Sequence, residues 1–106
     1  MNTVAAPPDT SRFERFPGWE IVAAGLADIA AGRTTPSACA VWIAYPRLRR
    51  AGLVDGRYDT RRLDAAELEL YRLLRSEGGD AYSRYNAFLR RLIRFEHALD
   101  RDSVRS

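Results

Sequence analysis

The sequence contains no lysine, so all 17 of its basic residues are arginine. It contains a single cysteine and a single histidine, which excludes an internal disulfide framework and a cysteine-rich zinc or iron–sulfur site. The longest unbroken apolar run, at residues 38–45, is far shorter than the roughly 20 residues needed to cross a bilayer. We therefore expect no disulfide, no metal or other cofactor, and no membrane partner.

A secretory signal is not expected either, because residues 1–8 contain neither a basic region nor an apolar run. A chain with one cysteine suits a reducing compartment, so we expect a cytoplasmic protein. Exclusive use of arginine together with frequent alanine is typical of a bacterial genome rich in G and C. The alternative is selection for phosphate or carboxylate binding, since the guanidinium group is a planar, bidentate donor.

The length of 106 residues allows one domain with its own core, and a hydrophobic fraction of 46% is typical of a globular protein. We divide the chain into a flexible N-terminal arm (residues 1–16), a single helical domain (residues 17–102) and a frayed C-terminus (residues 103–106). The arm shows no apolar periodicity apart from Phe13 and Phe16. We expect these two side chains to pin the end of the arm onto the domain.

Apolar residues recur at helical spacing along the chain, which predicts an all-α protein. The first helix is expected at residues 18–31. The second, at residues 35–45, has Thr35 as its cap and Pro36 in its first helical position, and it is apolar on every side. Such a helix is buried all round. Pro46 is expected to stop or kink it before a short amphipathic turn.

Two more helices follow a loop that is expected at residues 53–62. The third is expected at residues 64–76, with Asp64 as its cap. The fourth, at residues 80–101, gives the clearest pattern, because its apolar side chains project onto one arc of roughly 160°. This arc contains Tyr82, Tyr85, Phe88, Leu89, Leu92, Ile93, Phe95 and Leu99. Four or five helices with short connections predict a compact bundle.

Basic side chains on the opposite arc of the fourth helix form the first candidate binding surface. Several guanidinium groups on one side of a helix can engage a phosphate backbone or an acidic protein, whereas the ordinary alternative is a solvated helix face. The candidate binding residues are Arg84, Arg90, Arg91, Arg94 and His97, and Arg101 extends the set. A secondary basic cluster consists of Arg47, Arg49 and Arg50.

Glu96 falls inside the apolar arc of the fourth helix. A buried carboxylate must be paired, or its pKa must rise. We expect an ion pair with an arginine of the secondary cluster rather than a catalytic acid. Cys39 lies in the all-apolar helix, and we expect its side chain to pack rather than react.

Two further hypotheses come from resemblances to known protein classes. The spacing of His97 from Arg90 or Arg91 resembles the Arg–His pairing of helical ribonucleases of the HEPN type, in which two chains usually make the site. This resemblance covers one helix and implies a ribonuclease that requires His97. Residues 47–54 resemble the end of a winged helix-turn-helix recognition helix, but Pro46 and the apolar residues before it argue against that structure.

From the sequence we expect a small helical macromolecule-binding protein, namely an adaptor, a regulator or a small subunit of a bacterial complex, rather than an enzyme. A protein partner or self-association is expected, because Trp19, Trp42 and the N-terminal arm supply apolar surface. The alternatives are a nucleic-acid-binding protein, acting through residues 84–94 or the arginines of residues 47–62, and a HEPN-like ribonuclease.

Overall fold

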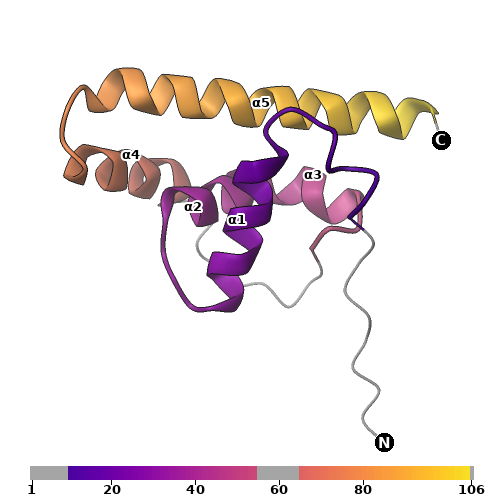
Figure 1. Ribbon diagram of the computed structural model, residues 1–106, viewed down its shortest axis with the longest axis horizontal. Coiled ribbons are helices and arrows are strands. Elements are labelled where there is room, and N and C mark those ends of the chain that lie inside the picture. Colours follow the sequence, from indigo (N-terminus) through magenta and orange to yellow (C-terminus); the bar gives the residue numbers. More distant parts are fainter. Residues whose placement is uncertain (1–9, 55–64, 106) are drawn as a thin grey trace, which may run out of the picture.

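A computed structural model describes residues 10–54 and 65–105, which form five α-helices (Figure 1). This part of the chain contains no strand, so the predicted all-α fold class is confirmed. The first nine residues of the expected arm, the expected cap Asp64 and most of the expected loop at residues 53–62 lie outside the described residues. The helices are α1 (Trp19–Ala30), α2 (Pro36–Ile43), α3 (Tyr45–Arg50), α4 (Ala66–Ser76) and α5 (Ala81–Arg105).

Helix α2 begins as the sequence predicts. The Thr35 hydroxyl accepts a hydrogen bond from the Ala38 amide at 3.1 Å, and Pro36 stands in the first turn, where its missing N–H group is not needed. The residues that follow are buried, as the all-apolar sequence requires. They are Ala38, Cys39, Ala40, Val41 and Trp42.

Helices α1 and α2 pack closely because a glycine lies between them. A Cβ atom on Gly25 would collide with the carbonyl oxygen of Ser37 and with the side chain of Val41. Gly18, just before α1, is also required, since its φ of +83° lies in the left-handed region. A Cβ there would also lie only 2.6 Å from the carbonyl oxygen of Arg91.

The break in the second predicted helix comes earlier than expected. Helix α2 ends at Ile43, and Ala44 separates it from α3. Pro46 does not stop a helix but lies in the first turn of α3, the position in which proline is tolerated. The short turn predicted after Pro46 is therefore part of a helix that includes the proline.

The bounds of the last two helices also differ from those predicted. Helix α4 begins at Ala66, and Ala65 occupies the N-cap position that was predicted for the residue before it. Helix α5 begins at Ala81, close to its predicted start, and continues past its predicted end to Arg105. An ion pair of 2.8 Å between Arg12 and Asp102 links its last turns to the N-terminal segment.

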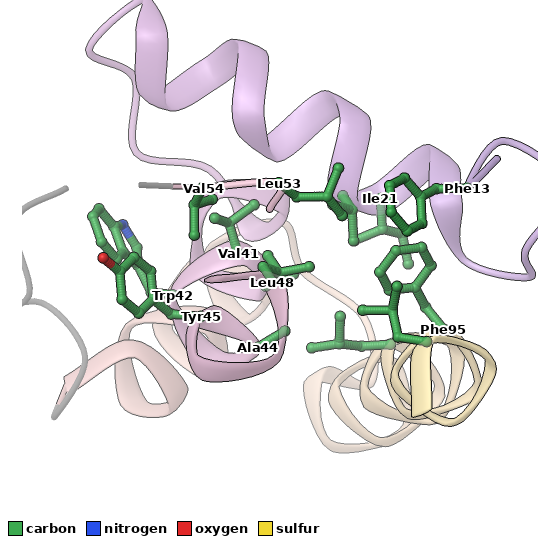
Figure 2. Close-up of a cluster of buried hydrophobic side chains, with 14 of the residues drawn as sticks. Phe13, Ile21, Val41, Trp42, Ala44, Tyr45, Leu48, Leu53, Val54 and Phe95 are labelled. Atoms are coloured by element: carbon green, nitrogen blue, oxygen red, sulfur yellow. The ribbon is translucent and has the colours of Figure 1, made fainter. Parts of the chain in front are cut away.

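The main core joins α1, α2, α3 and α5 with the residues that precede α1. Its largest fully buried side chains are Phe95, Leu48, Leu92, Val22 and Val41. Figure 2 shows Phe13, Ile21 and Phe95 at one end of this cluster, and Trp42, Tyr45 and Val54 at the other. A smaller cluster of Cys39, Leu70 and Leu74 joins α2 to α4, and Tyr85, Phe88 and Leu89 of α5 pack against it.

The expectation that Phe13 and Phe16 hold the N-terminal segment on the domain is confirmed. Phe13 is buried, and its ring lies 6.4 Å from that of Trp19 between centroids. The Phe16 and Trp19 rings each lie 6.1 Å from the Phe95 ring of α5. This aromatic group joins residues from both ends of the described chain.

The exposed apolar surface is not where the sequence placed it. Trp42 is buried, and its ring centroid lies 6.0 Å from that of Tyr45. Trp19 is half-buried. The large apolar side chains exposed among the described residues are Leu68 (56%), Tyr82 (69%) and Ile93 (44%). Tyr82 and Ile93 were assigned to the inward arc of α5. That arc is wider than the face of roughly 100° that a helix usually buries, and both lie near its edge.

Candidate binding surface

Helix α5 starts at a defined point because Asp80 caps it. The Ser83 amide donates a hydrogen bond to Oδ1 of Asp80 at 3.1 Å, and the Ser83 hydroxyl donates to Oδ2 at 2.8 Å. The backbone hydrogen bond, followed by the hydroxyl, lowers the pKa of the Asp80 carboxyl below its ordinary value. The acid also lies at the positive end of the helix dipole, which stabilises its charged form.

One face of α5 is fixed against the molecule and the opposite face is open. Leu92, Phe95 and Leu99 are buried against the main core. Figure 1 shows α5 running along one side of the molecule, with the other helices on its inner side only. No helix among the described residues, α5 included, is both long enough and apolar enough to span a bilayer.

The open face of α5 carries a row of basic side chains, which we call the α5 stripe: Arg90, Arg94, His97 and Arg101. They follow one another at steps of four, three and four residues, so they lie on one line along the helix. At a rise of 1.5 Å per residue the row is about 16 Å long. All four side chains are exposed, and none forms an ion pair with another described residue.

The acidic residues of α5 form no ion pair with the stripe, because each of them lies off its line and contacts another segment. Glu96 and Asp100 pair with Arg47 of α3, and Asp102 pairs with Arg12. The stripe is therefore a local concentration of positive charge in a chain whose net charge is only +3.

Two arginines of the predicted surface belong elsewhere. Arg91 forms an ion pair with Glu20 of α1. Nη1 of Arg84 lies 3.7 Å from Oε2 of Glu77, in the connection between α4 and α5. The pKa of Glu20 is lowered by its own backbone amide and then by Arg91. Of the five predicted binding residues, Arg90, Arg94 and His97 remain together on the open face, and Arg101 continues their line.

In the secondary basic cluster, too, one arginine forms internal ion pairs and the others do not. Arg47 Nη1 lies 3.0 Å from Oε2 of Glu96, and Arg47 Nε lies 3.4 Å from Oδ2 of Asp100. The predicted ion pair of Glu96 is thus confirmed, with Arg47 as the partner. Burial raises the pKa of Glu96, and Arg47 opposes that rise. Arg49 and Arg50 are exposed and have no partner among the described residues.

Hollows on other surfaces of the described part of the chain include two that were not predicted from the sequence. One, of about 340 Å³, lies between α4 and α5 and contains the exposed side chains of Leu68 and Tyr82. A second, of about 270 Å³, is lined by Thr34, Cys39, Trp42, Ala65, Ala66 and Glu69. The sequence did contain one indication of the hollow between α4 and α5. Leu68 is apolar but lies off the apolar stripe of its helix.

The ribonuclease hypothesis stays a prediction, because the site that it implies would be made by two chains. His97 and Arg90 lie on an open helix face, neither lines either of these hollows, and Arg91 is turned toward α1. Within the described residues, no group of three or more potential ligands could hold a metal ion. No family model, no curated protein and no solved structure matches the chain.

Proposed function

We propose that this chain is a macromolecule-binding module, and that it binds an acidic partner protein through the α5 stripe. It would act as an adaptor, a regulator or a small subunit of a cytoplasmic bacterial complex. The observation that carries the proposal is the row of Arg90, Arg94, His97 and Arg101 on an open helix face, none of which forms an ion pair with an acid among the described residues. Guanidinium groups bind carboxylates in bidentate geometry, which suits the side chains of Asp and Glu.

Nucleic acid is the competing ligand, and the small number of guanidinium groups in the α5 stripe argues against it. With Arg84, Arg91 and Arg47 in internal ion pairs, the stripe offers three guanidinium groups. Three phosphate contacts would give a salt dependence with a slope of only about −3 on a log–log plot, a weak electrostatic contribution. The net charge of the chain is only +3, which gives a weak overall electrostatic attraction to nucleic acid.

The proposal is tested with two polyanions, fluorescein-labelled poly-L-glutamate and a labelled DNA duplex, by fluorescence anisotropy. The variant Arg90→Glu/Arg94→Glu reverses the stripe. The matched variant Arg49→Glu/Arg50→Glu makes the same change in net charge on α3. We expect the stripe variant to bind poly-L-glutamate at least about tenfold more weakly than the wild type, and the α3 variant to be nearly unaffected.

Three results would contradict the proposal. Equal losses in the two variants would show that net charge, and not the stripe, determines binding. A loss confined to the α3 variant would move the site to Arg49 and Arg50. Tighter binding of the duplex than of poly-L-glutamate at the same salt concentration, lost in the stripe variant, would identify nucleic acid as the ligand.

A further inference from the structure

The groove between α4 and α5 combines apolar exposure with tyrosine side chains. Helix α4 supplies one wall and the first turns of α5 supply the other, and its volume is about 340 Å³. Figure 1 shows α4 running beside the N-terminal half of α5, and the short connection between them makes the pair antiparallel neighbours. The lining residues are Glu67, Leu68, Tyr71, Tyr82, Tyr85 and Asn86.

The exposure of Leu68 and Tyr82 is not explained by the packing of the domain. Single apolar side chains on a surface are common, but here two of the most exposed ones, from different helices, line the same groove. Beside them, the Tyr71 and Tyr85 rings meet edge to face at 5.7 Å between centroids, which joins the two walls. The exposed leucine and tyrosine therefore lie on one shallow, largely apolar surface between the two helices.

The flanks of the groove are basic on both sides. On α4, Arg75 lies one turn beyond Tyr71, and Arg72 lies one turn beyond Leu68. On α5, Arg90 lies one turn beyond Asn86 and begins the α5 stripe. These arginines are exposed and form no ion pair with a described residue.

An acidic side chain, Glu67, lies among these basic residues. Glu67 lines the groove itself, and its charge, after the effect of burial, raises the pKa of Tyr85. A carboxylate in this position repels an acidic ligand, so it limits rather than creates affinity.

We propose that this groove binds an amphipathic helix of the acidic partner, with the apolar face of that helix on Leu68 and Tyr82 and its acidic edges on the arginines of both flanks. The inference rests on the proposed function and names the part of the partner that is recognised. Helix α4 is about 16 Å long, so about three turns of the bound helix are in contact. A third helix laid along two antiparallel helices is a common mode of recognition.

The like charge on the two flanks also argues against a second copy of this chain as the occupant. A two-fold contact would place the arginine flanks of one copy next to those of the other, and like charges across an interface are unfavourable. An acidic helix removes that repulsion and neutralises both flanks.

The test is a selection from a displayed library of helical peptides with a fixed leucine stripe and randomised positions on both edges. The peptides are longer than about 15 residues, because shorter isolated helices are marginal. The full-length protein is the target. We expect the selected edges to be enriched in Asp and Glu, and a selected peptide to lose at least about tenfold in affinity with Leu68→Glu or Tyr82→Glu. Ala24→Glu, which places the same charge on an exposed site of α1, should have little effect.

A second pair of variants tests the groove by a gain of affinity. Glu67→Gln removes the acid that lines the groove and should tighten a selected acidic peptide by several-fold. Glu69→Gln makes the same change on the same helix but at the other hollow, and should leave the affinity unchanged. Both positions lie in α4, so an effect of charge on helix stability is common to the two variants.

The possible failures are distinguishable. If acidic peptides are selected but Leu68→Glu and Glu67→Gln leave their affinity unchanged, the groove inference is overturned, while dependence on Arg90 and Arg94 would still support the proposed function. If the selected edges are not acidic and the stripe variant binds normally, both proposals fail. If purified protein self-associates and Leu68→Glu makes it monomeric, the occupant is a second copy and the inference is wrong.

Discussion

Glu96 is the only charged side chain that is buried among the described residues, at 8% exposure. Burial raises its pKa above the ordinary value of 4.5, and Arg47 reduces that rise through its charge and its hydrogen bond. Folding therefore favours the protonated carboxyl. The stability that this proton contributes is complete below about pH 4.5 and is lost as the pH rises through the raised pKa.

The first prediction concerns this pH dependence. Glu96→Gln keeps the size of the side chain and cannot ionise. We expect its free energy of unfolding, relative to wild type, to rise as the pH is raised from about 4 to about 8. Urea titrations followed by circular dichroism at several pH values measure the difference, and a difference that stays constant with pH would contradict the argument.

The partner of Glu96 supplies the control for this prediction. Arg47→Met retains much of the apolar stem but removes the charge that opposes the rise in pKa. This variant should lose about 1 to 3 kcal/mol at neutral pH and much less near pH 4, where Glu96 is protonated. Equal losses at both pH values would show that Arg47 acts through packing alone.

The sequence predicted an ion pair of Glu96 with an arginine of the secondary cluster, but not which of the three arginines forms it. Helical periodicity placed Glu96 among apolar neighbours, and that alone required a cationic partner. Arg47, and not Arg49 or Arg50, forms the pair because of the way α3 is rotated relative to α5. No local sequence pattern predicts that rotation. The same limit applies to Arg84 and Arg91, whose acids lie on other segments.

At the scale of the elements, α1 and α2 are held together where Gly25 faces Ser37 and Val41. Helix propensity alone predicts that Gly25→Ala stabilises α1 by about 1 kcal/mol. The packing predicts the opposite sign, because the added methyl group would collide with the backbone of α2. We expect a net loss of about 1 to 3 kcal/mol in a thermal or urea titration. A gain in stability would show that the helices can separate at no cost.

A second variant identifies the obstacle. Val41→Ala removes the side chain that a Cβ on residue 25 would meet, but the carbonyl oxygen of Ser37 remains. We therefore expect no recovery of stability when Val41→Ala is added to Gly25→Ala. Full recovery would show that the side chain, and not the backbone, sets the helix separation.

The helices themselves were largely predictable, because their caps and periods are local. Thr35 with Pro36 predicted the start of α2 correctly, and the apolar period placed the start of the last helix at residue 80, one residue before α5 begins. The junction at Ala44 was not predictable in detail, since proline can end one helix or begin the next and only the packing of α2 decides between them. The α4–α5 groove was not predicted, because an exposed leucine indicates a groove only when the side chains facing it from the neighbouring helix are known.

At the scale of the whole molecule, the residues before α1 act as part of the core. Phe13 is 3% exposed, and Phe16 beside it is only half-buried. Phe13→Ala should lower the free energy of unfolding by about 3 to 5 kcal/mol, and Phe16→Ala by clearly less. Urea titrations of the two variants measure the difference. Equal and small losses would mean that the segment is dispensable for the fold.

The aromatic group of Phe16, Trp19 and Phe95 and the ion pair of Arg12 with Asp102 have a kinetic consequence. They connect positions that are almost as far apart along the chain as this structure allows. Helical proteins usually fold fast because their contacts are local, whereas these contacts require a nearly complete loop to close first. We expect the packing of α1 on α2 to be local and early, and the docking of α5 to be the slow step that completes folding.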